Sequence, residues 1–123
     1  MGAKEIEKIL GGVNEKGKFL AVLLTDHEGF PIASVSSAEY DPEIQAALIG
    51  LVQRATGQAS EQLGVAANTE FTMLDTKGNL FVSRPFSYHD VDMVLSFLIP
   101  GRDQPYRRLM SQTIVAIQQT FDF

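Results

Sequence analysis

The sequence predicts an α+β fold with the element order α-β-β-α-β-β-β-α, in which helices cover both faces of a central antiparallel five-stranded sheet. Two observations indicate this architecture. Short apolar runs are joined in pairs by Asp-x-x-Gly turns, which is typical of β-hairpins. Three further segments carry apolar residues at helical spacing. One sheet and three amphipathic helices bury all of their apolar faces only when helices pack on both sides of the sheet.

The composition is that of one ordinary globular domain. The chain has 123 residues, of which 45% are hydrophobic and 20% charged, and we expect a single domain over residues 1–123. A net charge of −5 and only 10 Lys and Arg residues argue against nucleic-acid binding. The absence of cysteine excludes disulfides, thiolate catalysis and Cys-based zinc sites. Without an apolar secretory or membrane-spanning run, we expect a cytoplasmic protein.

Residues 3–10 predict a short amphipathic helix, which Gly11 and Gly12 are expected to stop. The following segment, residues 12–18, has the letters GxxxxGK of a phosphate-binding loop. That loop requires Ser or Thr at the next position, where Phe19 stands, and it requires a helix to follow rather than a strand. We therefore interpret this segment as a polar loop and not as a nucleotide site.

A first hairpin is predicted after this loop. Residues 19–25 are apolar enough to form a strand buried on both faces, and Asp26 begins a turn. Residues 30–34 form the returning strand. Pro31 cannot donate a hydrogen bond to a neighbouring strand, so we place this second strand at an edge of the sheet.

A long helix is predicted over residues 42–63, with Asp41 as its N-cap and Pro42 at the first helical position. At about 100° per residue, one side carries the larger apolar residues and is expected to lie on the sheet. This sheet-facing set is Ile44, Leu48, Leu51, Val52, Ala55 and Ala59. The opposite side is uncharged and consists of Ala46, Ile49, Gly50, Gln53, Gly57 and Ser60.

Small residues on the back of a helix allow another backbone to approach closely. A solvated face normally carries charges, so we interpret the uncharged side as a contact with another protein chain. A bulky residue at Gly50 would then prevent dimerisation. The alternative is that another part of the same chain covers this side.

Three strands and a helix complete the prediction. Strands are expected over residues 69–74, 79–83 and 91–99, and residues 84–90 form a looser connection. The last helix is expected over residues 104–120.

Asp103 is the expected cap of this last helix. Arg84 and Arg102, both in predicted loops, are candidates for an arginine finger toward a partner's nucleotide, the alternative being solubilising surface charges.

His27 lies at a hairpin tip beside Asp26 and Glu28, where adjacent side chains rarely converge on one metal ion. His89 has Ser87 and Asp90 nearby, at a spacing too close for a catalytic triad to form easily. We therefore expect no catalytic residue, no metal site and no cofactor.

Three segments resemble the Roadblock family, the dynein-light-chain domain that also occurs as stand-alone bacterial and archaeal proteins. They are AVLLTDHEGFPIAS at residues 21–34, the Ala- and Gly-rich helix around residues 46–50, and LDTKGNLFVS at residues 74–83. The element order is similar over essentially the whole chain, as it is in the related longin-like and profilin-like folds. The resemblance implies dimers, either homodimers or heterodimers, in which third strands pair and long helices pack together. In this sequence, the implied dimer contacts correspond to the uncharged side of the long helix and to Glu70, Thr72 and Leu74 of the third strand.

The resemblance also implies a function in regulation. Prokaryotic relatives often partner a small Ras-like GTPase, so the leading hypothesis is a non-enzymatic homodimer that binds the switch and nucleotide region of such a GTPase. Ile49, Gln53 and Ser60 are the residues expected to remain for that partner. One alternative is a nucleotide-independent scaffold or adaptor, which could bind another Roadblock-like chain. An enzyme or small-ligand sensor is a third, for which the sequence shows no convergent polar cluster.

Overall fold

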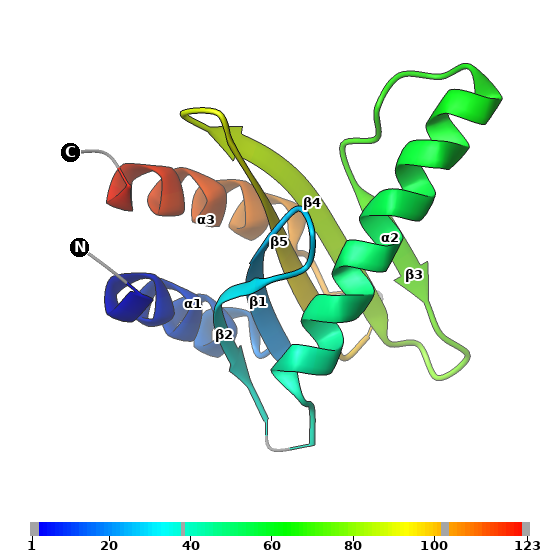
Figure 1. The fold of residues 1–123 in the computed structure, drawn as a ribbon. Helices are drawn as coiled ribbons and strands as arrows, with labels where there is room; N and C mark the ends of the chain where they lie inside the picture. Colours follow the sequence, from blue (N-terminus) through cyan, green and yellow to red (C-terminus); the bar gives the residue numbers. More distant parts are fainter. Residues whose placement is uncertain (1–2, 38, 102–103, 122–123) are drawn as a thin grey trace.

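The computed structural model describes residues 3–37, 39–101 and 104–121, and over these ranges the predicted order of helices and strands is confirmed (Figure 1). The strand order in the sheet is β2-β1-β5-β4-β3, and all neighbouring strands are antiparallel. The elements are α1 (Ala3–Gly17), β1 (Ala21–Asp26), β2 (Pro31–Ser36), α2 (Pro42–Leu63), β3 (Phe71–Leu74), β4 (Leu80–Tyr88), β5 (Val91–Ile99) and α3 (Arg107–Thr120).

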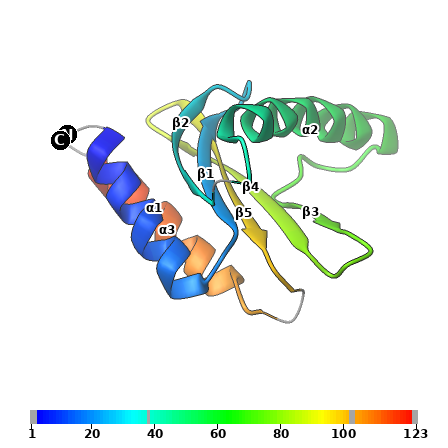
Figure 2. The ribbon, with the colours of Figure 1, turned by 90° about the horizontal axis from the view of Figure 1, so that it is seen from below.

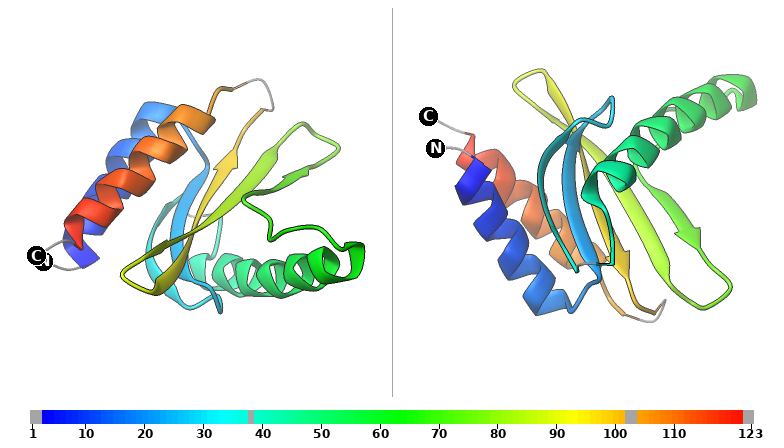
Figure 3. Two further views of the ribbon diagram at one scale, coloured as in Figure 1. Left: turned by 90° about the horizontal axis from the view of Figure 1, so that it is seen from above. Right: turned by 60° about the horizontal axis from the view of Figure 1, so that its bottom comes forward.

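Helices cover both faces of the sheet, as predicted. α1 and α3 lie side by side on one face, and α2 crosses the other (Figures 2 and 3). The larger core lies between the sheet and the α1–α3 layer, where the rings of Phe19 and Phe97 stack with centroids 4.6 Å apart. A smaller core beneath α2 contains Leu23, Ile49 and Val94.

Helix α1 is longer than predicted, because it continues through both glycines to Gly17. Each glycine costs about 1 kcal/mol relative to alanine in a helix. The continuing burial of Ile6, Leu10 and Val13 at helical spacing offsets this cost. Most of the segment predicted as a polar loop is therefore helical, so that prediction was wrong.

The first hairpin confirms the role assigned to its turn and its proline. The Asp26 carboxylate accepts the backbone N–H groups of Glu28 and Phe30, each at 2.9 Å. Strand β2 is an edge strand, and the register of its pairing shifts where Thr25 faces Pro31. The proline thus sits where a missing N–H group can be tolerated.

Strand β4 includes most of the segment predicted to be a loose connection. It pairs with β5 as far as Tyr88, and the chain then turns at His89 and Asp90, which have positive φ angles of 52° and 64°. Pro85 does not interrupt the strand, because β3 pairs with β4 only as far as Ser83. Beyond that residue one side of β4 is an open edge, which accommodates the missing N–H group of proline.

The boundaries of α2 are those predicted, and the Asp41 carboxylate caps it by accepting the Glu43 N–H group. Helix α3 begins later than predicted and has no side-chain cap at Tyr106. Asp103 and Arg102 lie outside the described residues. None of the helices in the described ranges has the length and apolar character needed to span a membrane.

Candidate protein interface

Helix α2 faces the sheet with the side that was predicted to point outward. Three residues of the predicted outward set are buried within the chain: Ala46, Ile49 and Gly50. Conversely, three residues predicted to lie on the sheet are 62%, 52% and 54% exposed: Ile44, Leu48 and Leu51. The predicted rotation of α2 was therefore wrong, and the buried residues are not available to a second chain.

The reason is a close contact between α2 and the first hairpin. A Cβ atom at Gly50 would lie 2.3 Å from the carbonyl oxygen of Glu28 and 3.2 Å from the Cα atom of Gly29. The small residues of α2 thus admit a backbone, as their size indicated, but it is the backbone of the same chain. This is the alternative that the sequence left open.

The second half of α2 is mostly exposed. It extends past the sheet (Figures 1 and 3). Of the remaining predicted interface residues, Gly57 is exposed, whereas Gln53 and Ser60 are half-buried. Gln53 lies beside His27 and Asn68, at a hollow near the first hairpin.

Strand β3 is the other edge of the sheet. Its outer side has no neighbouring strand within the described part of the chain, and it contains only four residues. Two of the predicted interface residues, Thr72 and Leu74, lie on this strand and are exposed. Met73, which was not predicted, is 54% exposed on the side that faces α2.

An apolar groove of about 400 Å³ separates α2 from the β3 side of the sheet. We call it the α2–β3 groove, and its apolar lining consists of Leu48, Val52, Phe71, Met73, Phe81 and Leu98. Leu48 and Val52 were predicted to lie against the sheet. The first half of α2 has apolar residues on several sides, and this could have signalled a second buried surface.

Glu70, the third predicted residue of this strand, points into the chain. Its carboxylate accepts hydrogen bonds from Tyr106 at 2.8 Å and from Arg84 at 3.0 Å, and the other Arg84 nitrogen donates to Ser111 at 2.8 Å. This Glu70 cluster fastens the start of β3 to α3. Arg84 is consequently a structural residue on β4 and not a free arginine finger.

Burial raises the pKa of Glu70, but the hydrogen bonds from Tyr106 and Arg84 outweigh it and hold the pKa below the ordinary value of 4.5. The same cluster raises the pKa of Tyr106, through burial and through its hydrogen bond to Glu70. The lowered pKa of Glu70 keeps its carboxylate ionised at neutral pH. Among the described residues, no group of three potential metal ligands comes together.

Comparison with known proteins assigns the family. The model of the Roadblock/LC7 domain matches residues 5–84, so the chain belongs to the Roadblock/LC7 domain family. No curated protein sequence matches significantly.

Several solved structures share the fold. Myxococcus xanthus MglB aligns with a TM-score of 0.79 at 15% identity, covering 96% of this chain and 88% of MglB. The gliding protein MglB from Thermus thermophilus aligns with a TM-score of 0.76 at 14% identity, covering 95% and 88% of the two chains. A Roadblock/LC7 domain from Streptomyces avermitilis gives a TM-score of 0.69 at 11% identity, covering 93% and 95%.

The rotation of α2 can be tested at its glycines. Gly50→Ala is expected to destabilise the protein by about 1–3 kcal/mol, because the new Cβ atom would strike the Glu28 carbonyl oxygen. Gly57→Ala, where a Cβ atom would meet nothing within 4 Å, is expected to stabilise it by about 0.5–1 kcal/mol. Urea unfolding followed by circular dichroism measures both. Equal stability of the two variants would contradict the assigned rotation.

The Glu70 cluster predicts a pH-dependent stability. Glu70→Gln is expected to lower the free energy of unfolding by about 1–2 kcal/mol at pH 7. Because the folded-state pKa lies below 4.5, the wild-type advantage is present above that pH and disappears as the pH falls through the folded-state pKa. Unfolding curves of the two proteins should therefore converge in acid. Curves that stay parallel would refute this role, and the exposed Glu39→Gln serves as the control.

Proposed function

We propose that this protein is a non-enzymatic protein-binding module that forms a homodimer through β3 and the α2–β3 groove. The carrying observation is that an unpaired strand edge and a continuous apolar surface lie next to each other. Apolar patches of this kind on soluble proteins are typical of protein interfaces. The resemblance to the Roadblock family implied a dimer contact through the same two elements, the third strand and the long helix.

The edge of β3 is suited to pairing with a second copy. Exposed edge strands are usually protected by charges, prolines or bulges, and the segment Phe71–Leu74 contains neither a charge nor a proline. Two such edges related by a two-fold axis can join into one sheet across both protomers. Met73 on this strand and Leu48 on α2 line the adjoining groove, which the α2 helix of the second copy would cover in such a dimer.

We further propose that the dimer regulates a small Ras-like GTPase by binding its switch and nucleotide region. Support comes from membership in the Roadblock/LC7 family, from the resemblance described above, and from the fold shared with the gliding protein MglB. Arg84 is engaged by Glu70 and Ser111, which favours action through binding over donation of a catalytic group. Such a module would shift the GTPase between its conformational states.

Dimerisation predicts a specific loss on charge insertion. Leu48→Glu would bury an unpaired carboxylate in the interface and is expected to weaken self-association about 100-fold or more. Val115→Glu, at a residue that is 51% exposed on α3, is the matched control and should leave the dimer intact. Multi-angle light scattering over a concentration series measures both. A wild-type protein that stays monomeric at about 1 mM would contradict the proposed homodimer.

GTPase regulation predicts nucleotide-dependent binding. The immobilised dimer is expected to retain a Ras-like GTPase from the source organism at least about tenfold better in one nucleotide state than in the other. GTP-analogue-loaded and GDP-loaded samples, assayed in parallel, provide the comparison. Equal retention in both states would favour the nucleotide-independent adaptor.

A further inference from the structure

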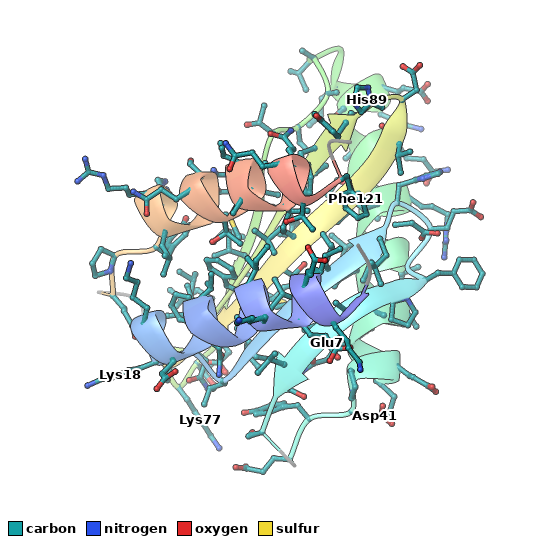
Figure 4. All side chains as sticks on the ribbon, turned by 90° about the vertical axis from the view of Figure 1, so that its left-hand side faces the viewer. Glu7, Lys18, Asp41, Lys77, His89 and Phe121 are labelled. Atoms are coloured by element: carbon teal, nitrogen blue, oxygen red, sulfur yellow. The ribbon has the colours of Figure 1, made fainter. Side chains whose placement is uncertain are left out.

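A second groove, of about 340 Å³, lies between α1 and α3 on the face of the sheet opposite α2. The two helices run side by side in opposite directions, because the chain enters α1 and leaves α3 at the same end (Figure 3). Figure 4 looks directly onto this pair of helices. We call this feature the α1–α3 groove, and its floor includes Ile9, Val13 and Leu109.

The charged residues that line this groove are basic. Lys8 and Lys16 contribute from α1, and none of the described lining residues is a carboxylate. Arg108 lies one turn before the lining residue Gln112, on the same side of α3. The carboxylates of α1 lie outside the lining: Glu5, Glu7 and Glu15. A basic, partly apolar groove is thus present on a chain whose net charge is −5.

The surface of α1 is open between the two lysines. Gly12 lies between the two lysines in the lining, and a Cβ atom there would meet nothing within 4 Å. Lys8 and Lys16 are separated by about 12 Å along the helix axis. Side chains of a third helix can fit into the shallow groove between two adjacent helices.

We propose that the α1–α3 groove binds an acidic amphipathic helix of a partner protein. Apolar residues on one side of that helix would contact Ile9 and Leu109, which are only partly buried. Carboxylates about one heptad apart, or about 10.5 Å, would match the spacing of Lys8 and Lys16. Amphipathic helices bind grooves in this way through residues that repeat at helical spacing.

The lining places Ile9 and Gly12 between Lys8 and Lys16 along α1, a pattern that a helix with one apolar and one acidic side complements along its length. The site is also separate from the proposed dimer interface, since α2 and the α2–β3 groove lie on the opposite face of the sheet. The proposal therefore does not depend on the proposed function.

The test uses a fluorescent helical peptide of about 15 residues, with leucines at heptad a and d positions and two glutamates one heptad apart. Fluorescence anisotropy measures its affinity, and NMR shift perturbation locates the site. We expect binding that maps to α1 and α3 and weakens with added salt. A version with lysines replacing the two glutamates should bind at least about tenfold more weakly. Failure of the acidic peptide to bind at about 1 mM, or equal binding of both peptides, would overturn the proposal.

Two adjacent glycines supply a matched pair of variants. Gly12→Leu fills the groove and is expected to weaken peptide binding about tenfold. Gly11→Leu makes the same change in the same helix outside the lining, also with nothing within 4 Å of the new Cβ atom, and should retain the affinity. Equal affinities of the two variants would contradict the site.

Charge reversal and lipid vesicles complete the test. Lys8→Glu should weaken binding of the acidic peptide. The lysine-substituted peptide should bind this variant more tightly than it binds the wild type. The control Lys77→Glu, on an exposed turn, should leave the affinity for both peptides unchanged. Vesicles containing anionic lipid distinguish a membrane surface. The proposed helix binding would be overturned in favour of lipid binding by two results together: the wild type does not bind the peptide, and Gly12→Leu binds anionic vesicles more tightly than the wild type does.

Discussion

The packing of α2 depends on one close contact between backbones. At Gly50 the helix approaches the turn of the β1–β2 hairpin so closely that a methyl group would not fit. This contact fixes the rotation of α2 about its own axis. Ala46 and Ile49 then face the sheet, while Leu48 and Leu51 remain on the surface. The apolar character of the α2–β3 groove follows from that rotation.

The fold itself could be predicted from the sequence because its signals are local. Both Asp-x-x-Gly turns form through the same hydrogen bonds, with Asp75 accepting N–H groups as Asp26 does. Alternating apolar residues identified β5 with its boundaries, and Asp41 with Pro42 identified the start of α2. Each of these features is set by residues close together in the chain.

The errors arose where a distant segment decides the outcome. Periodicity could not orient α2, because Ile49 and Leu48 are both apolar and only the hairpin turn determines which of them is buried. Gly11 and Gly12 were interpreted as a helix end, although the core contacts of the residues around them sustain α1. The partners of Glu70 within the chain, Arg84 and Tyr106, likewise could not be identified from sequence spacing.

The position of β5 also constrains how the chain can fold. The family model ends at residue 84, yet β5 lies in the middle of the sheet, with β1 on one side and β4 on the other. Ala21 pairs with Leu98, so the two hairpins join into one sheet only through residues far apart in the sequence. Such topologies fold slowly, since the entropy of a long loop is lost before the pairing compensates for it. During synthesis, the side of β1 that pairs with β5 would therefore remain unpaired until β5 has left the ribosome.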